Sequence, residues 1–236
     1  MSSGDSALGA IERAIVVCTR CPELRAYCAG IAEERKAAYR DQVYWGRPVP
    51  AFGDPNARVV LVGLAPGAHG SNRTGRVFTG DASGEWLYRA LFRAGFANKP
   101  QSVAQDDGLV LKDALITAAL RCAPPKNKPT PLQLARCAPY LREEFETLRR
   151  MRVVVGLGAI GTRAAYQTLV ALGFTFAERA PFAHGAESLA TSGRRSVTLL
   201  ASYHPSQQNT NTGVLTERML DAIFSRARQL VGNASA

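Results

Sequence analysis

Short apolar runs alternate with amphipathic segments along most of the chain. Runs rich in β-branched and aliphatic residues predict four buried strands, at residues 59–64, 114–120, 152–157 and 196–202. Apolar residues at helical spacing predict five helices, over residues 6–38, 83–94, 131–150, 158–171 and 215–230. The first helix is interrupted at residues 18–22, and residues 174–196 predict a loop or a short hairpin.

The order of these elements predicts the fold class. Strands separated by helices indicate an α/β protein with a mainly parallel sheet and helices on both faces. A length of 236 residues is enough for such a domain to bury a full core, so we expect a single domain over residues 1–236. Residues 1–5 and 232–236 are expected to be flexible ends.

Polar loops follow three of the predicted strands. The loop after residues 59–64 is long and carries an aromatic residue, an acid, a His and two Arg, which favours a functional role over a plain connection. The second loop starts at Arg121 and the third at Tyr203. Because the carboxyl ends of parallel strands meet at one edge of a sheet, the three loops predict one shared site.

The charge balance points to a class of partner. The chain has 29 basic and 19 acidic residues, a net charge of +10 and a pI near 9.8. This excess favours a polyanionic partner, most often nucleic acid, over a generally basic surface. The N-terminus lacks the basic start and apolar core of a signal peptide, and no apolar run approaches the ~20 residues of a membrane span. We therefore expect a soluble, cytoplasmic protein with no membrane partner.

Four of the five cysteines form a candidate metal-binding set. Cys18 and Cys21 make a Cys-x-x-Cys pair, and Cys122 and Cys137 follow at a spacing unlike that of a zinc ribbon. Four thiolates suit Zn²⁺ or an iron–sulfur cluster equally well, so the spacing alone leaves the metal open. The odd count argues against a disulfide scaffold and leaves Cys28 as a free thiol.

Three longer motifs occur together in this chain. They are the segment GLAPGAHGSNRTGR from Gly63 to Arg76, the segment CAPPKNKP from Cys122 to Pro129, and the segment HPSQQN from His204 to Asn209. With the Cys-x-x-Cys-Pro that begins at Cys18, they resemble the family 5 uracil-DNA glycosylases in sequence and in order. The resemblance covers nearly the whole chain, from about residue 11 to residue 230.

The resemblance implies a fold, an activity and a cofactor. The implied fold is a three-layer α/β/α sandwich around a four-stranded parallel sheet. The implied activity is monofunctional hydrolysis of the N-glycosidic bond of uracil and other deaminated bases in double-stranded DNA, which leaves an abasic site as the first step of base excision repair. No nucleotide cofactor is expected, and we expect a monomer. The implied cofactor is a [4Fe–4S] cluster on Cys18, Cys21, Cys122 and Cys137.

The expected base pocket and DNA contacts come from the same motifs. Such an enzyme flips the damaged nucleotide out of the helix into a pocket. Phe78 is the expected stacking face, with anchoring of its loop to the core as the alternative. The other expected base contacts are Gly63, Ala65, Gly67, Ala68, His69 and Ala118. The expected DNA contacts are Arg73, Arg76, Lys126, Lys128, Ser206, Gln207, Gln208 and Asn209, the last three as fillers of the gap in the duplex.

Cleavage of the bond builds positive charge on the sugar and negative charge on the base, which indicates electrostatic catalysis. His204 is expected to donate a hydrogen bond to the departing base. Many related glycosylases have an acidic or amide side chain directly after the first Gly of the first motif, where this chain has Leu64. Because Leu64 has no polar group, we expect Asp81 or Asn127 to position the water. Capping of the following helix is the alternative role for Asp81.

Ala118 predicts broad base specificity. In uracil-specific relatives an Asn at the corresponding place reads the edge of the pyrimidine, whereas Ala118 has no polar group that a wrong base would leave unpaired. We expect release of uracil and hypoxanthine, and also of xanthine and modified pyrimidines. Two alternatives stay open: a bifunctional glycosylase/lyase with Lys126 or Lys128 as Schiff-base nucleophile, and a non-catalytic iron–sulfur DNA-binding module.

Overall fold

The computed structural model describes residues 7–232. The flexible ends expected at residues 1–5 and 233–236 lie outside this range. Gly232, also assigned to the flexible C-terminal end, is the last residue of a helix. Among the described residues, no helix is long and apolar enough to cross a bilayer.

A seven-stranded sheet lies at the centre of the described chain, in the order β1-β3-β2-β4-β7-β6-β5. The strands are β1 (Phe52–Gly53), β2 (Val59–Gly63), β3 (Ala114–Ala118), β4 (Val153–Leu157), β5 (Thr175–Phe176), β6 (Glu187–Ser192) and β7 (Arg195–Ser202). The four inner strands are parallel, which confirms the expected four-stranded parallel sheet. Strands β1, β6 and β5 extend it with antiparallel pairs at both edges.

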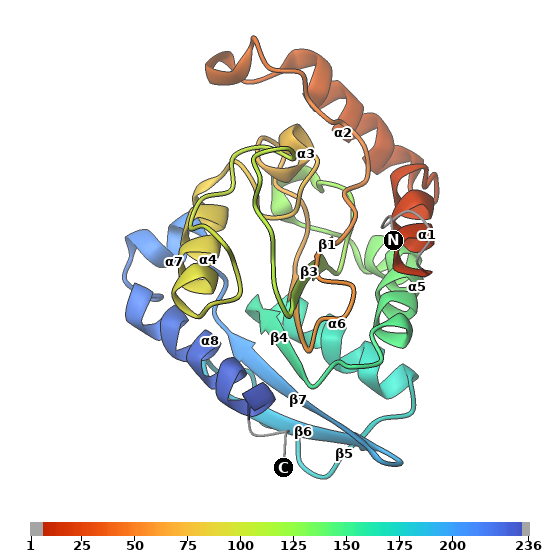
Figure 1. Cartoon of the computed structure of the whole chain (residues 1–236). Coiled ribbons are helices and arrows are strands. Elements are labelled where there is room, and N and C mark those ends of the chain that lie inside the picture. Colours follow the sequence, from red (N-terminus) through yellow and green to blue (C-terminus); the bar gives the residue numbers. More distant parts are fainter. Residues whose placement is uncertain (1–6, 233–236) are drawn as a thin grey trace.

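Helices cover both faces of this sheet (Figure 1). The helices are α1 (Ala7–Val16), α2 (Pro22–Glu34), α3 (Ser71–Thr74), α4 (Ala82–Arg93), α5 (Pro131–Thr147), α6 (Gly158–Ala171), α7 (Gln207–Asn211) and α8 (Glu217–Gly232), with short 3-10 turns η2 (Ala37–Tyr39) and η3 (Pro125–Asn127). The predicted break in the first helix separates α1 from α2, which has a Pro at its first turn.

Alternation along β2 explains the three layers. Val59 and Leu61 point to one face of the sheet, where they pack in a core with α4 and α8. Val60 and Val62 point to the other face and pack with α5 and α6. Helix α6 approaches β2 closely because Gly161 has no side chain: a Cβ there would lie 2.2 Å from the Val62 carbonyl oxygen. The expected α/β/α sandwich is therefore confirmed.

The segment 174–196 is more ordered than its sequence pattern suggests. Strand β6 pairs with β7 in an antiparallel hairpin that runs from Glu187 opposite Leu200 to Ser192 opposite Arg195. Buried and exposed residues alternate along β6, with Ser188 and Ala190 facing inward. These inward residues are small or polar, so the strand lacks the aliphatic signal that predicted the inner strands.

Candidate active site

A cleft of about 480 Å³ opens at the carboxyl ends of β2, β3 and β7. The three polar loops meet there, as the parallel strand order predicts. The residues that line it are Leu64, Ala65, Pro66, Gly67, Ser71, Val77, Phe78, Asp81, Ala82, Ser83, Ala118, Asn127, His204, Ser206, Gln207 and Gln208. All three residues expected to be catalytic are among them.

Asp81 both caps a helix and faces the cleft. Its Oδ1 accepts a hydrogen bond from the Gly84 backbone N–H at 3.0 Å, which begins α4. Its Oδ2 lies against the first motif, since a Cβ at Gly70 would be only 2.1 Å from that oxygen. Burial raises the pKa of Asp81, and the N–H groups of Gly84 and Ser83 oppose this shift. The capping interpretation and the catalytic one are therefore compatible.

His204 lines the cleft as a neutral imidazole. Burial lowers the pKa of His204 to about 4, so the ring is uncharged at neutral pH. Its ring centroid lies 5.7 Å from that of Phe78, at an interplanar angle of 30°. Gly158, with a φ of +81°, supports it from behind, where a Cβ would be 3.1 Å from the His204 Cβ. A neutral imidazole retains one N–H that can donate to an oxygen in the cleft.

Phe78 is held in a strained backbone conformation. Its φ is 51°, in the left-handed region that bulky residues rarely adopt. The ring lies against Gly63, where a Cβ would come within 2.7 Å of the Phe78 Cε2. The ring also packs on the core formed with α4 and α8. The Phe78 ring therefore anchors its loop to the core and also lines the cleft, and Gly63 acts by making room for the ring.

Arg73 and Arg76 are not placed for the phosphate contacts expected of them. Arg73 donates from Nε to the His69 carbonyl oxygen at 2.7 Å and from Nη2 to the Gly80 carbonyl oxygen at 2.7 Å. Arg76 is 3% exposed and forms an ion pair with Asp107 at 2.6 Å. Both guanidinium groups are buried and use their donors inside the protein, so we correct this assignment: they hold the loop of the first motif in shape.

Two further expected base contacts also lie away from the cleft lining. His69 Nδ1 is 3.2 Å from the Tyr44 hydroxyl, and burial lowers the pKa of His69. Ala68 packs in the small core that contains the cysteines. Their roles are in the packing of the loop, whereas Ala65 and Gly67 do line the cleft.

The remaining expected DNA contacts divide into exposed and internal groups. Lys126 and Lys128 are exposed at η3, beside Asn127 of the cleft. Gln207 and Gln208 are exposed and line the cleft, and Ser206 caps α7. The Asn209 side chain instead donates to the His204 carbonyl oxygen at 2.9 Å. Asn209 is therefore engaged in positioning the His204 loop, and its expected role as a filler of the duplex gap stays a prediction.

The four expected metal ligands surround one small cavity between α2, the loop after β3 and α5. Cys21, Cys122 and Cys137 are buried and Cys18 is partly exposed. Burial raises the pKa of Cys137, and the nearby Cys18 and Cys21 add to this shift. Cys28 lies outside this lining, although its thiol contacts that of Cys122, and its sulfur donates to the Ala123 carbonyl oxygen.

Four thiols around one cavity are the type of donor set that a thiolate-bound metal group requires. Within residues 7–232, no group of three or more His, Cys, Asp or Glu side chains has the geometry to hold a single metal ion. A four-iron cluster takes one thiolate on each iron, so its ligands do not have to converge on one point. Arg121 is 2% exposed, lines the same cavity, and has buried Nε and Nη1 atoms without a hydrogen-bond partner. Its Nη2 pairs with the buried Glu144 carboxylate at 2.6 Å, so its charge is already matched and only Nε and Nη1 are left as donors toward a group bound there.

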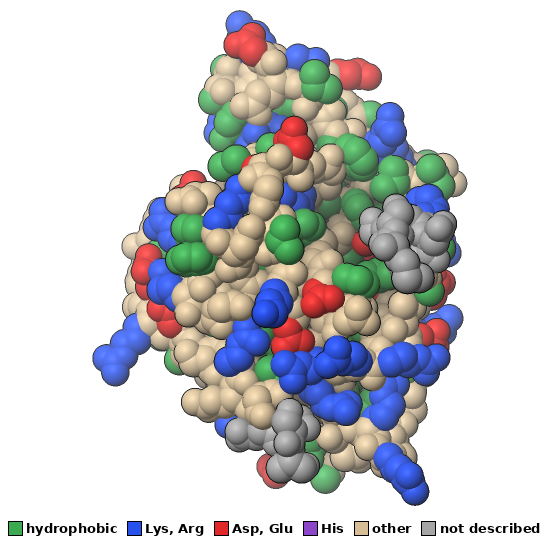
Figure 2. Space-filling view, viewed as in Figure 1, with side chains coloured by type: hydrophobic (Ala, Val, Ile, Leu, Met, Phe, Trp, Pro, Cys, Tyr) green, Lys and Arg blue, Asp and Glu red, His purple; other side chains and the backbone are tan. Residues whose placement is uncertain are grey.

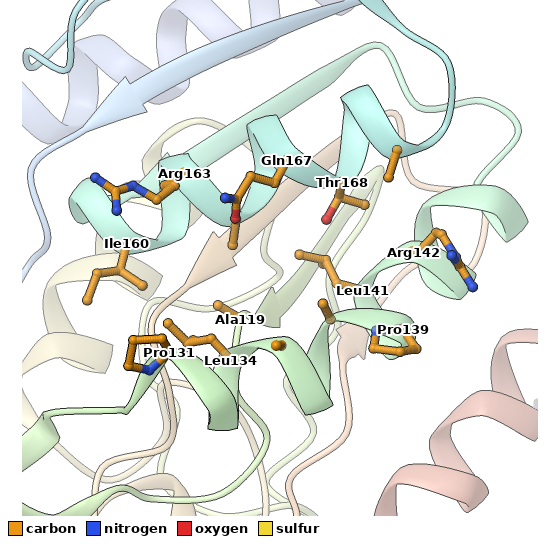
Figure 3. Close-up of a pocket in the computed structure, with 14 residues that line it drawn as sticks. Ala119, Pro131, Leu134, Pro139, Leu141, Arg142, Ile160, Arg163, Gln167 and Thr168 are labelled. Carbon is orange, nitrogen blue, oxygen red and sulfur yellow. The ribbon is translucent and has the colours of Figure 1, made fainter.

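A larger hollow of about 540 Å³ lies between α5 and α6, away from these groups (Figure 3). Its walls are mainly apolar, with Leu134, Leu141 and Ile160 among them. Its charged residues are Arg142 and Arg163, and no acid, His or Cys lines it. It therefore lacks the groups that acid–base or electrostatic catalysis requires, and the cleft with Asp81 and His204 is the candidate active site.

Sequence reasoning missed one supporting residue of this site. Gly161 provides the close packing of strand and helix, whereas Gly158 lies against the His204 loop. Its positive φ and its contact with His204 show that it positions the third loop. A Gly directly after a strand was the available signal, but the contact partner is 46 residues away in sequence and left no local pattern.

Comparison with known proteins agrees with the geometry. Residues 50–228 match the sequence model of the uracil DNA glycosylase superfamily. The chain is 49% identical to the type-5 uracil-DNA glycosylase of Thermus thermophilus over 223 residues, which cover 94% of this chain and 98% of that protein. It is 44% identical to the type-5 enzyme of Mycobacterium leprae over 234 residues, 98% of this chain and 99% of the other.

A match to a type-4 enzyme is weaker than the matches to type-5 enzymes. The type-4 uracil-DNA glycosylase of Archaeoglobus fulgidus is 31% identical over 158 residues, which cover 66% of this chain and 69% of that protein. The type-5 matches are higher in identity and extend over nearly the full chain. The protein therefore belongs to the uracil-DNA glycosylase superfamily and, within it, to the type-5 uracil-DNA glycosylases.

Proposed function

We propose that this protein removes uracil and other deaminated bases from double-stranded DNA by hydrolysis of the N-glycosidic bond, and that it initiates base excision repair. Membership of the type-5 family supports the uracil-DNA glycosylase activity. The observation that carries the proposal is the presence of a buried carboxylate, Asp81, and a neutral imidazole, His204, in one cleft with an aromatic face.

The charges of the cleft match those of the reaction. As the bond to the base breaks, positive charge develops on the sugar and negative charge on the base. Ionised Asp81 offsets the sugar charge and orients the attacking water, while the His204 N–H donates to the base oxygen that gains charge. Phe78 provides a flat face for the flipped base. The exposed Lys126 and Lys128 beside the cleft contact phosphates of the same duplex.

We propose a broad base range because the cleft presents few fixed polar side chains to the base edge. Ala118 lines the cleft and offers only a methyl group at the position where a polar side chain would recognise the base edge. The volume of about 480 Å³ accommodates a purine as well as a pyrimidine.

Substituting Ala118→Asn tests this range. The Asn amide can pair with the N3–H and O4 of uracil, whereas the larger purine ring displaces the matching N1–H and O6 of hypoxanthine and leaves the amide unpaired, so we expect hypoxanthine release to fall by about 100-fold or more relative to uracil release. Single-turnover release of free base from duplexes with one uracil, hypoxanthine, xanthine or thymine measures the change. Ala118→Leu, of similar size without the amide, is the control and should slow both bases alike. A wild-type protein that releases only uracil contradicts the proposal.

We propose that Cys18, Cys21, Cys122 and Cys137 hold a [4Fe–4S] cluster, for which the shared cavity and the unpartnered Arg121 donors are the support. When bound, such a cluster ties α2 to α5 and to the loop that carries Asn127. The cluster therefore fixes one wall of the cleft, and no step of hydrolysis passes through it.

Iron and sulfide analysis of protein purified without oxygen tests the cluster. We expect a brown protein with about four irons per chain. Cys137→Ser should lose most of the iron and the visible absorbance, whereas Cys28→Ser, a thiol outside the cavity lining, should keep both. A colourless protein that contains zinc, or equal iron loss in the two variants, is the contrary outcome.

A further inference from the structure

Five arginines gather at the amino-terminal edge of the sheet, opposite the cleft. Arg149, Arg150 and Arg152 lie between α5 and β4, and Arg194 and Arg195 lie at the turn from β6 to β7. We call these five residues the arginine edge. Figure 2 shows Lys and Arg side chains gathered over this part of the molecule, near the start of β4 and the end of α5.

The arginine edge is not neutralised by the protein. Within the described residues, none of its five members forms an ion pair, whereas neighbouring Arg58 pairs with Asp113 at 2.7 Å and Arg226 pairs with Glu187 at 2.7 Å. Arg149, Arg150, Arg152 and Arg194 are exposed. Like charges held close together cost free energy unless a counter-charge binds, which makes such a cluster a candidate anion site.

Arg195 is the least exposed of the five arginines and lies near two of the others. Burial lowers the pKa of Arg195, and the charges of Arg149 and Arg152 add to this shift. Its Nε and Nη2 atoms are buried and have no hydrogen-bond partner. Its Cζ lies 5.3 Å from the centroid of the Phe174 ring, so the guanidinium is held in place. Arg195 therefore adds its charge to the edge, while the four exposed arginines supply the donors that an anion in solution can reach.

The cleft and the arginine edge lie at opposite ends of the parallel strands. The five residues of β4, at about 3.3 Å each, separate Arg152 from the cleft edge by roughly 16 Å, and the two edges face opposite directions. A polyanion on the arginine edge is therefore a separate molecule or a separate segment. The exposed residues beside Arg194 and Arg195 are Gly193 and Ser196, which offer no apolar anchor for a protein partner.

We propose that the arginine edge binds the phosphate backbone of a second DNA segment, without base specificity, while the cleft engages the damaged one. Guanidinium groups pair with phosphate oxygens in bidentate fashion, and release of counterions drives the binding. The protein then bridges two duplexes and moves between segments without full dissociation. This inference rests on the proposed function in one respect only, that DNA is the polyanion that the cleft binds.

A capture assay tests the arginine edge. The probe is an immobilised duplex with one abasic-site analogue, which occupies the cleft, and a fluorescent undamaged duplex in solution. We expect the wild-type protein to capture the second duplex. Arg149→Gln/Arg150→Gln/Arg152→Gln should reduce capture by about 10-fold or more and lower the slope of log K against log salt by about 2 to 3, since each lost phosphate contact contributes about 0.9.

The control removes the same charge elsewhere. Arg142→Gln/Arg163→Gln/Arg218→Gln lies on α5, α6 and α8 outside the arginine edge and should keep capture. Uracil release from a single duplex, measured in parallel, should stay within about twofold of the wild-type rate in both triple variants. If the wild-type protein releases no uracil, the proposed function is rejected, whereas the bridging of two duplexes is judged by the capture assay alone. Equal capture by the two triple variants overturns the inference. So does a wild type that retains poly-L-glutamate but no second duplex, which would indicate an acidic protein partner.

Discussion

Asp81→Asn is expected to slow uracil release by about 100-fold or more while leaving the stability of the fold nearly unchanged. Asn is as good a helix cap as Asp, so it keeps the hydrogen bond from the Gly84 N–H that begins α4. It removes the negative charge that faces the cleft, and with it the offset of the charge on the sugar. Single-turnover release from a uracil duplex gives the rate, and thermal unfolding gives the stability.

Asp81→Ala separates the two roles of this side chain. It lacks both the charge and the cap, so its rate should match that of Asp81→Asn while its free energy of unfolding falls by about 1 kcal/mol. Because burial raises the pKa of Asp81, the wild-type rate should fall on acidification at a pH above the usual Asp range, and this limb should vanish in Asp81→Asn. Full activity of Asp81→Asn would show that Asp81 is a cap alone.

His204→Ala is expected to lower the rate by about 100- to 1,000-fold, the usual cost of one lost donor to a developing anion. Burial lowers the pKa of His204 to about 4, so the ring is neutral above that value and charged below it. The wild-type rate should therefore show no step near pH 6.5, where an ordinary His titrates. The measurement is the pH dependence of single-turnover uracil release.

His204→Asn is the matched variant for this residue. Its amide keeps an N–H donor, so it should recover part of the rate that His204→Ala loses. The lowered pKa of His204 also affects the free energy of unfolding. Between pH 6.5 and about 4 the unfolded chain binds a proton at this residue and the folded chain does not, so the free energy of unfolding falls as the pH falls through that window. A rate that rises as pH falls through 6.5 would mean that the charged imidazole is the active form, against this account.

The inner sheet and its helices follow from the sequence because their signal is local. The runs over β2, β3, β4 and β7 are short, aliphatic and bounded by breakers, and parallel order brings their loops to one edge. Asp81 followed from the same kind of signal, since an acid before a helical pattern marks a cap. The hairpin at β6 was less visible because its inward residues carry no strong hydrophobic pattern.

The arginines of the first motif show where local reasoning fails. Arg76 stands in a polar loop, where exposure is the default, yet its partner Asp107 lies 31 residues further on. Arg73 is covered by residues from the segment before β1, with Gln42 accepting from Nη1 and Tyr39 stacked 3.9 Å beneath it. No periodicity in sequence reports such contacts, because they form only when distant loops fold against each other.

The arginine edge could not be located from the sequence, although the excess of basic residues was visible there. The net charge of +10 can be counted from the sequence, but its position on the surface cannot. Arg149, Arg152 and Arg195 meet only because β4 and β7 are parallel neighbours, so that their starting ends lie side by side. Net charge therefore predicted a polyanionic partner, whereas the position of the arginine edge follows only from the order of the strands in the sheet.

Hydrolysis of the base–sugar bond and the lyase reaction leave different products on a uracil duplex. The wild-type protein is incubated with a duplex that contains one uracil, in the presence of borohydride, and both free uracil and covalent protein–DNA adducts are quantified. We predict stoichiometric release of free uracil, an intact strand whose abasic site borohydride reduces, and no adduct; a parallel incubation without borohydride should leave the abasic site alkali-labile. A trapped adduct on Lys126 or Lys128 would establish the lyase mechanism, and absence of free uracil would contradict the account as a whole.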